Sequence, residues 1–184
     1  MSPERPKARV VFDCMVFLQG AARRESPAAA CLLLAELGVV ELCVSNEILS
    51  EIRDVLTRPS IQQRFPALTD AVVDRFLSAL GEHSLLISPV PRLFVYDRDP
   101  KDEPYINLAI AAGARYLVSR DADILDLAPA ASLGGARIQS HAPELQILDP
   151  VSFLAVLRRP GPGSAPECSR SEVFRDSILS SRDP

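Results

Sequence analysis

The chain has 184 residues, enough for one domain with a sizeable core and too few for two comfortable ones. Its composition, 47% apolar and 24% charged, is that of an ordinary globular protein. The net charge of −4 argues against holding nucleic acid by bulk electrostatic attraction. No apolar run approaches the roughly 20 residues of a membrane span, and the first residues lack the apolar stretch of a signal peptide. We therefore expect a cytoplasmic protein without membrane contact.

The cysteines and histidines argue against a zinc site. The four cysteines show no C-x-x-C spacing, and three of them lie inside apolar runs, which favours small buried thiols. The two histidines, His83 and His141, have no partner at ligand spacing. The cysteines are Cys14, Cys31, Cys43 and Cys168.

The first half of the chain alternates short apolar runs with segments of helical spacing. The runs predict strands at 9–12, 39–44 and 84–88, and the spacing predicts helices at 28–37, between 46 and 58, and within 60–83. Ser26 followed by Pro27 is typical of a helix start, and Gly38 is typical of a helix end.

The middle of the chain combines an acidic turn, a helix, a reversal, a buried strand and a second acidic turn. Pro104 suits the first turn of the helix, and Gly113 suits its C-terminal end. The apolar run 116–119 is typical of a strand covered on both faces. The helix runs antiparallel to that strand, so Asp102 before the helix and Asp121 after the strand are expected at one edge of the sheet.

The last part of the chain completes the same alternation. We predict a short helical turn at 123–127, a loop at 128–143, a strand at 145–148 and a helix at 151–157. From residue 159 the composition shifts to Pro, Gly and Ser, which argues against a packed element. Strands that alternate with helices predict an α/β fold with a parallel sheet. The predicted division is an N-terminal extension (1–8), one α/β domain (9–158) and a flexible tail (159–184).

Four acidic residues are predicted to gather at the carboxyl ends of the strands, where open parallel sheets place functional groups. Asp13 follows the first strand, Asp121 follows the fourth, and Asp102 opens the helix between. Glu51 lies about one and a half turns into the helix after the second strand, and its side chain leans back toward the same edge. Four such carboxylates repel each other unless some are protonated or a cation neutralises them. Oxygen ligands without histidine or cysteine suit Mg²⁺ or Mn²⁺.

Each acid alone also has a simpler interpretation. Asp102 and Asp121 are both placed where capping and the helix dipole favour aspartate. Glu51 fits a solvated helix face, and Asp13 fits a loop. Taken together, four acids at strand ends in one α/β chain favour the metal site.

Five sequence motifs resemble those of the PIN-domain nuclease family and follow one another in the same order as in that family. The resemblance is to the branch identified as toxins of bacterial toxin–antitoxin pairs. They span most of the chain ahead of the tail. The matching segments are residues 10–13, 45–56, 99–102, 116–125 and 147–154.

The resemblance implies a three-layer α/β/α domain with a central parallel sheet of four to five strands. It places the family's acidic quartet on Asp13, Glu51, Asp102 and Asp121, as metal-binding and catalytic residues. Ser119 falls on a position whose hydroxyl can orient a carboxylate, and Asp123 is a candidate outer acid. The implied activity is Mg²⁺- or Mn²⁺-dependent hydrolysis of single-stranded or structured RNA. The implied partners are an RNA substrate, a cognate antitoxin protein and a second copy in a homodimer.

One departure from the family pattern leaves an alternative open. The family usually follows its first aspartate with Thr-Asn, and here Cys14-Met15 stands instead. Loss of that amide favours a catalytically weak or inactive PIN-like module that binds RNA or protein. A phosphatase or phosphotransfer domain ranks last, because it usually needs a second aspartate at position 15, and no glycine-rich phosphate loop follows the first strand.

Several basic residues are candidates for contact with substrate phosphates, although solvated surface is the more ordinary interpretation of each. They are Arg23, Arg24, Arg53, Lys101 and Arg120.

Overall fold

The protein is built around a five-stranded, entirely parallel sheet. The computed structural model describes residues 7–128 and 132–158. The strand order is β3-β2-β1-β4-β5, which confirms the predicted α/β fold with a parallel sheet. The strands are β1 (Arg9–Phe12), β2 (Glu41–Val44), β3 (Ser84–Leu86), β4 (Tyr116–Val118) and β5 (Gln146–Leu148).

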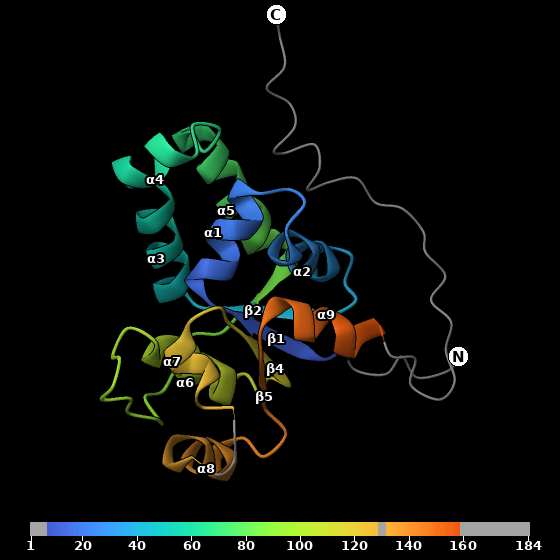
Figure 1. Cartoon of the computed structure of the whole chain (residues 1–184), viewed down its shortest axis with the longest axis vertical. Helices are drawn as coiled ribbons and strands as arrows, with labels where there is room; N and C mark the ends of the chain where they lie inside the picture. The colour runs from blue at the N-terminus through green and yellow to red at the C-terminus, as the bar shows by residue number, and fades with distance from the viewer. Residues whose placement is uncertain (1–6, 129–131, 159–184) are drawn as a thin grey trace, which may run out of the picture.

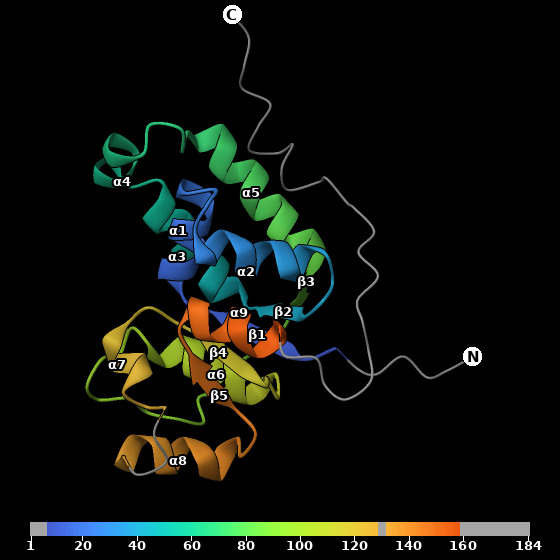
Figure 2. The ribbon, with the colours of Figure 1, turned by 45° about the vertical axis from the view of Figure 1, so that its right-hand side comes forward.

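Helices cover both faces of this sheet and make a three-layer α/β/α domain (Figures 1 and 2). Helices α1 to α5 lie on one side together with α9, which packs against α2. Helices α6 to α8 lie on the other side. The helices are α1 (Cys14–Ala22), α2 (Pro27–Glu36), α3 (Asn46–Leu56), α4 (Pro59–Arg64), α5 (Asp70–His83), α6 (Glu103–Ala111), α7 (Ala122–Leu125), α8 (Leu133–His141) and α9 (Pro150–Arg158).

The strand order places a switch point between β1 and β4. The chain moves outward from β1 through β2 to β3, then returns across the sheet to β4 and continues outward to β5. β1 and β4 pair from Val10 opposite Tyr116 to Phe12 opposite Val118. Their connections leave in opposite directions, so a crevice is expected beyond their carboxyl ends. Asp13 lies at this crevice, directly after β1, and its backbone N–H donates to the Val118 carbonyl at 3.0 Å.

Local helix signals in the sequence are confirmed at several boundaries. Ser26 caps α2 and Ser45 caps α3, each accepting a hydrogen bond from a backbone N–H in the first turn. Gly38 and Gly113 adopt φ values of +66° and +58°, a conformation that favours glycine where a helix reverses into a strand. These short reversals hold β2 and β4 in line with β1.

Helix α1 was not predicted. Its sequence is apolar on nearly every side, because the helix is enclosed by α2 and α3, and this hides the usual helical periodicity. Gly20 allows α2 to approach closely, since a Cβ there would lie 2.3 Å from Leu32 Cδ1. The start signal was Asp13 itself, which caps the helix.

The loop predicted at 128–143 is wrong for most of its length, because α8 occupies Leu133–His141. The pair Gly134-Gly135 disfavours a helix on propensity alone. Tertiary contacts override it: Ile138 is buried, and the Arg137 guanidinium lies 4.7 Å from the centre of the Phe94 ring.

Other expectations concern thiols, membranes and the chain ends. Cys31 and Cys43 are buried and free, and Cys14 is half-buried and free. No helix in the described part of the chain is long and apolar enough to cross a membrane. Cys168, the tail at 159–184 and most of the extension at 1–8 lie outside the described residues.

The rings under α9 give a stability prediction for this part of the domain. Phe153 is fully buried, with its ring centre 6.0 Å from that of Phe12 and 5.3 Å from that of Tyr116. Phe153→Ala should lower the free energy of unfolding by about 3–5 kcal/mol, because it leaves a cavity against β1 and β4. Urea denaturation measures this. Val151→Ala, at a residue 61% exposed on the same helix, should change it by less than about 0.5 kcal/mol. Equal effects of the two changes would show that α9 is not docked as described.

Candidate metal-binding active site

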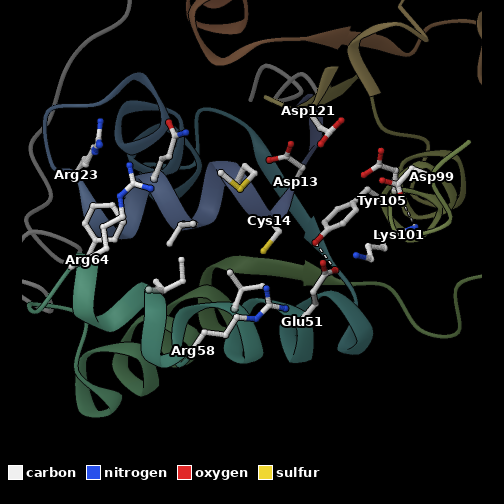
Figure 3. A pocket seen from close by; sticks show the side chains of 17 residues that line it. Asp13, Cys14, Arg23, Glu51, Arg58, Arg64, Asp99, Lys101, Tyr105 and Asp121 are labelled. Atoms are coloured by element: carbon white, nitrogen blue, oxygen red, sulfur yellow. Dashed lines mark hydrogen bonds between the residues drawn. The ribbon is translucent and has the colours of Figure 1, made fainter. Parts of the chain in front are cut away.

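All four predicted acids line one pocket beyond the carboxyl ends of β1 and β4. The pocket has a volume of about 740 Å³, and its lining includes Asp13, Glu51, Asp102 and Asp121. Figure 3 shows Asp13, Asp121 and Glu51 at one end of this pocket, together with Asp99. The structure therefore brings to one place side chains that lie up to 108 positions apart in the sequence, as counted from Asp13 to Asp121.

Asp13 is buried and held at both of its carboxylate oxygens. Oδ1 accepts a hydrogen bond from the Val16 N–H at 2.7 Å, which caps α1. Oδ2 accepts from the Arg120 N–H at 2.9 Å and from the Ser119 hydroxyl. Burial raises the pKa of this carboxyl, and these hydrogen bonds oppose that rise. The side chain of Asp13 is thus fixed between the start of α1 and the end of β4.

Ser119 links two of the acids. Its hydroxyl donates to Asp13, and its oxygen accepts the backbone N–H of Asp121 at 2.8 Å. Ser119 is fully buried, so this link is shielded from competing water. Asp121 in turn accepts the Asp123 N–H at 2.8 Å and caps α7. The serine therefore connects the Asp13 carboxylate to the backbone of Asp121.

Asp102 is the least satisfied acid of the pocket. It precedes α6, but its side chain makes no capping hydrogen bond. Its Oδ2 atom is buried and has no hydrogen-bond partner among the described residues. Burial, followed by the charges of Asp121, Asp99 and Asp13, raises the pKa of Asp102 to about 7. Helix capping accounts for the positions of Asp13 and Asp121, but it does not account for Asp102.

Glu51 reaches the pocket from α3 and is held by a residue of α6. The Tyr105 hydroxyl donates to Glu51 Oε2 at 2.7 Å, and the tyrosine is 2% exposed. Cys14 lines the same part of the pocket. Burial, and then the charges of Glu51 and Asp13, raises the pKa of this thiol to about 12, so it stays protonated near neutral pH.

The segment that leads to Asp102 is anchored by side chains of α6. Asn107 Oδ1 accepts the backbone N–H groups of Leu93 and Phe94 at 2.7 and 2.8 Å, and its amide donates to the Phe94 carbonyl at 2.9 Å. Glu103 accepts the Tyr96 N–H at 3.2 Å. This stretch has no strand partner, so the side chains of α6 take the place of a sheet ladder in fixing it.

Several pocket residues were missed as site residues from the sequence. Asp99 lines the pocket and raises the pKa of Asp102, and its Asp-Pro-Lys-Asp motif was the available signal. Tyr105 fits the apolar spacing of its helix, and this spacing gives no sign of a contact with Glu51. No sequence signal pointed to Arg58 or Arg64, which also line the pocket.

Only some of the other residues predicted from the sequence line this pocket. Asp123 does not line the pocket and pairs with Arg98 at 2.5 Å. Arg53 is engaged outside it with Asp74, whereas Arg23 and Lys101 do line it. Arg24 and Arg120 line a neighbouring hollow.

The donor set fits a hard divalent cation in its chemistry. Within 7–128 and 132–158, no three His, Cys, Asp or Glu side chains are already placed to hold a metal ion. Glu51 faces Tyr105, and Asp13 is occupied by its hydrogen bonds. The donors are nevertheless oxygens of the type that Mg²⁺ and Mn²⁺ prefer. A cation would neutralise the repulsion among the carboxylates, and the unpartnered Asp102 oxygen could serve as one of its ligands.

The raised pKa of Asp102 predicts that the metal-free protein becomes less stable as the pH rises. The native state binds the proton of Asp102 more tightly than the unfolded chain does, so this contribution to stability is complete below about pH 4 and is lost as the pH rises to about 7. In EDTA, wild type should therefore lose stability relative to Asp102→Asn as the pH rises. The free energy of unfolding of Asp102→Asn minus that of wild type should increase by on the order of 2 kcal/mol between about pH 4 and pH 8. Urea denaturation across pH tests this. Asp54→Asn, at an exposed position of α3, should show no such trend. A pH-independent difference for Asp102→Asn would contradict the expectation.

The buried link through Ser119 gives a second prediction. Ser119→Ala removes the hydroxyl that joins Asp13 to the Asp121 backbone, so a buried carboxylate and a partly buried backbone N–H each lose a partner. We expect the free energy of unfolding to fall by about 1–3 kcal/mol. Ser140→Ala, at an exposed serine of α8, serves as the control in the same denaturation experiment. Unchanged stability of Ser119→Ala would show that the link contributes little.

Comparison with known proteins places the chain in a family. A family model described as the PIN domain matches residues 9–123, which is more than half of the chain. Comparisons with curated proteins and with solved structures gave no match. The matched region contains β1 to β4 and all four acids, and α8, β5 and α9 complete the same domain beyond it. The chain belongs to the PIN-domain family, and its fold is of the nuclease type.

Proposed function

We propose that this protein is a metal-dependent endoribonuclease. The observation that carries the proposal is the buried, unpartnered oxygen of Asp102 in a pocket lined by three further acids of the predicted quartet. PIN domains are generally nucleases. A structural role alone does not explain why a carboxylate is buried among other carboxylates without a partner.

The four acids have distinct roles in this proposal. Asp13, Asp102 and Asp121 would hold Mg²⁺ or Mn²⁺, and Glu51 would hold the ion or orient the attacking water. The ion would supply Lewis-acid stabilisation of charge on the phosphodiester and a lower pKa for water at the site. Ser119 keeps the Asp13 carboxylate oriented, and Tyr105 does so for Glu51. This support reduces the reorganisation needed when the substrate binds.

The motif resemblance is the basis for four further parts of the proposal: RNA as the substrate, the toxin role, the antitoxin partner and the homodimer. The five segments at 10–13, 45–56, 99–102, 116–125 and 147–154 support them. We also propose a cytoplasmic location, because PIN-domain proteins are usually cytoplasmic. The structure supplies the pocket in which a phosphodiester would be cut.

A PIN-like module that binds RNA without cutting it is the second candidate. Met15 favours it, because this residue lines the pocket and is 41% exposed at a position where the family usually has asparagine. A thioether cannot donate the hydrogen bond that an amide would offer to an acid or a water.

A cleavage assay separates the two candidates. Wild type, Asp102→Asn and the surface control Asp54→Asn are incubated with a mixed RNA pool in Mn²⁺, Mg²⁺ or EDTA. We expect cleavage by wild type and Asp54→Asn in Mn²⁺ or Mg²⁺ and none in EDTA. Asp102→Asn should be slower by on the order of 100-fold or more, because loss of even an outer-shell partner typically costs 10- to 100-fold.

Metal binding is followed in parallel by the rise in melting temperature on adding Mn²⁺. Binding of Mn²⁺ by wild type without cleavage of any RNA would favour the binding module. Neither binding nor cleavage would refute the assignment of the acids.

A further inference from the structure

The pocket has a second end whose charge is opposite to that of the acids. Arg23 and Arg64 line it, together with the half-buried Phe65. Figure 3 shows Arg23 and Arg64 at the end of the pocket away from Asp13 and Asp121. Arg23 follows the last residue of α1, and Arg64 is the last residue of α4, so two separate segments bring these cations together.

The two arginines lie beside the same aromatic ring and form no ion pair with another described residue. Their guanidinium carbons lie 5.9 Å (Arg23) and 5.6 Å (Arg64) from the centre of the Phe65 ring. Neither forms an ion pair with a carboxylate in the described part of the chain. Other arginines do, such as Arg53 with Asp74 and Arg98 with Asp123. Two unpaired cations beside one ring at a pocket wall favour an anionic ligand.

The shape of the pocket restricts which anion can use both ends. A cavity of about 740 Å³ is in the range that holds a ligand of drug-like size, and this allows about one or two nucleotides. A ligand that reaches the recessed acids and the arginines needs at least two phosphates joined by a flexible linker. Paired bases of a double helix cannot follow its backbone into such a recess, whereas a single strand can.

A neighbouring hollow offers a continuation beyond the arginine end. It shares Gln19 and Arg23 with the pocket, so Arg23 stands at the junction of the two. Arg120 lines this hollow, and its guanidinium donates to Gln19 Oε1 at 2.8 Å. A strand that passes Arg23 therefore reaches a hollow that is lined by two further arginines, Arg24 and Arg120, and by one acid, Glu25.

We propose that Arg23 and Arg64, supported by Phe65, form a subsite for the phosphate backbone of single-stranded RNA, at least one nucleotide away from the phosphodiester that lies over the acids. The inference rests on the proposed function and adds to it the residues that hold the strand away from the acids. The subsite sets the direction in which the strand leaves the acidic end.

The test measures RNA binding separately from cleavage. Fluorescence anisotropy follows a labelled single strand of about 12 nucleotides, and the same strand annealed to its complement, in EDTA over a range of NaCl concentrations. The variants are R23Q/R64Q, the charge-retaining R23K/R64K, and R75Q. Arg75 is an exposed residue of α5 that does not line the pocket and makes no ion pair in the structure as described.

For the single strand, wild type and R75Q should show the same dependence of log K on log[NaCl]. R23Q/R64Q should show a slope shallower by about 1.4, since each phosphate contact to a single strand contributes about 0.7. R23K/R64K should restore the slope, because lysine keeps the charge. Duplex binding should not distinguish the variants. Thermal unfolding checks that all of them are folded.

Three results would overturn the subsite: no binding of the single strand by wild type, a slope unchanged in R23Q/R64Q, or an equal change for the duplex. A shallower slope in R23Q/R64Q supports the subsite even if wild type cleaves no RNA in Mn²⁺, in which case only the nuclease proposal fails. Cleavage by wild type with an unchanged slope in R23Q/R64Q leaves the nuclease proposal intact and removes the subsite.

Discussion

The Asp13 carboxylate joins the two halves of the sheet at its switch point, and the arrangement of the acidic pocket depends on it. One oxygen caps α1, which follows β1, and the other accepts hydrogen bonds from Ser119 and Arg120, which follow β4. A single buried side chain thus fixes the start of a helix and the turn that carries Asp121. Its hydrogen bonds favour the ionised form that burial disfavours, so Asp13 can be both a structural cap and a charged pocket residue.

Asp102 is the point at which this arrangement destabilises the native state. Its carboxyl is buried next to other acids without a hydrogen-bond partner, whereas Asp13 and Asp121 both have partners. Buried polar groups without partners are rare in proteins because each one destabilises the native state. Two hydroxyl donors of the site are already used by other acids: Tyr105 donates to Glu51, and Ser119 donates to Asp13. Stability is therefore lost at Asp102, in a position where a bound cation would restore it.

The sequence was sufficient for the sheet and for the placement of the acids, because both follow from short apolar runs and from residues directly after them. It was insufficient where tertiary contacts override local preference. Helix α1 is apolar at nearly every position, including the 41% exposed Met15, so no polar face reveals its period. Helix α8 forms despite Gly134-Gly135 because Ile138 and Arg137 pack on the rest of the domain. The partners of the acids were equally hidden. The bond from Tyr105 to Glu51 joins residues 54 positions apart, and no periodicity predicts such a pair.

The net charge of −4 describes the electrostatics of this protein poorly, because the pocket has acids at one end, with Lys101 among them, and two arginines at the other. The acids lie beyond the ends of β1 and β4, and Arg23 and Arg64 lie where α1 and α4 end. A uniformly basic pocket would hold a polyanion in many registers. Here an RNA strand would be attracted at the arginines and repelled at the acids until a cation neutralises them. Binding of the strand and loading of the metal are then coupled: each should strengthen the other, since both reduce the same repulsion. A protein with few local cations and a charged recess can in this way position a strand that its overall charge would repel.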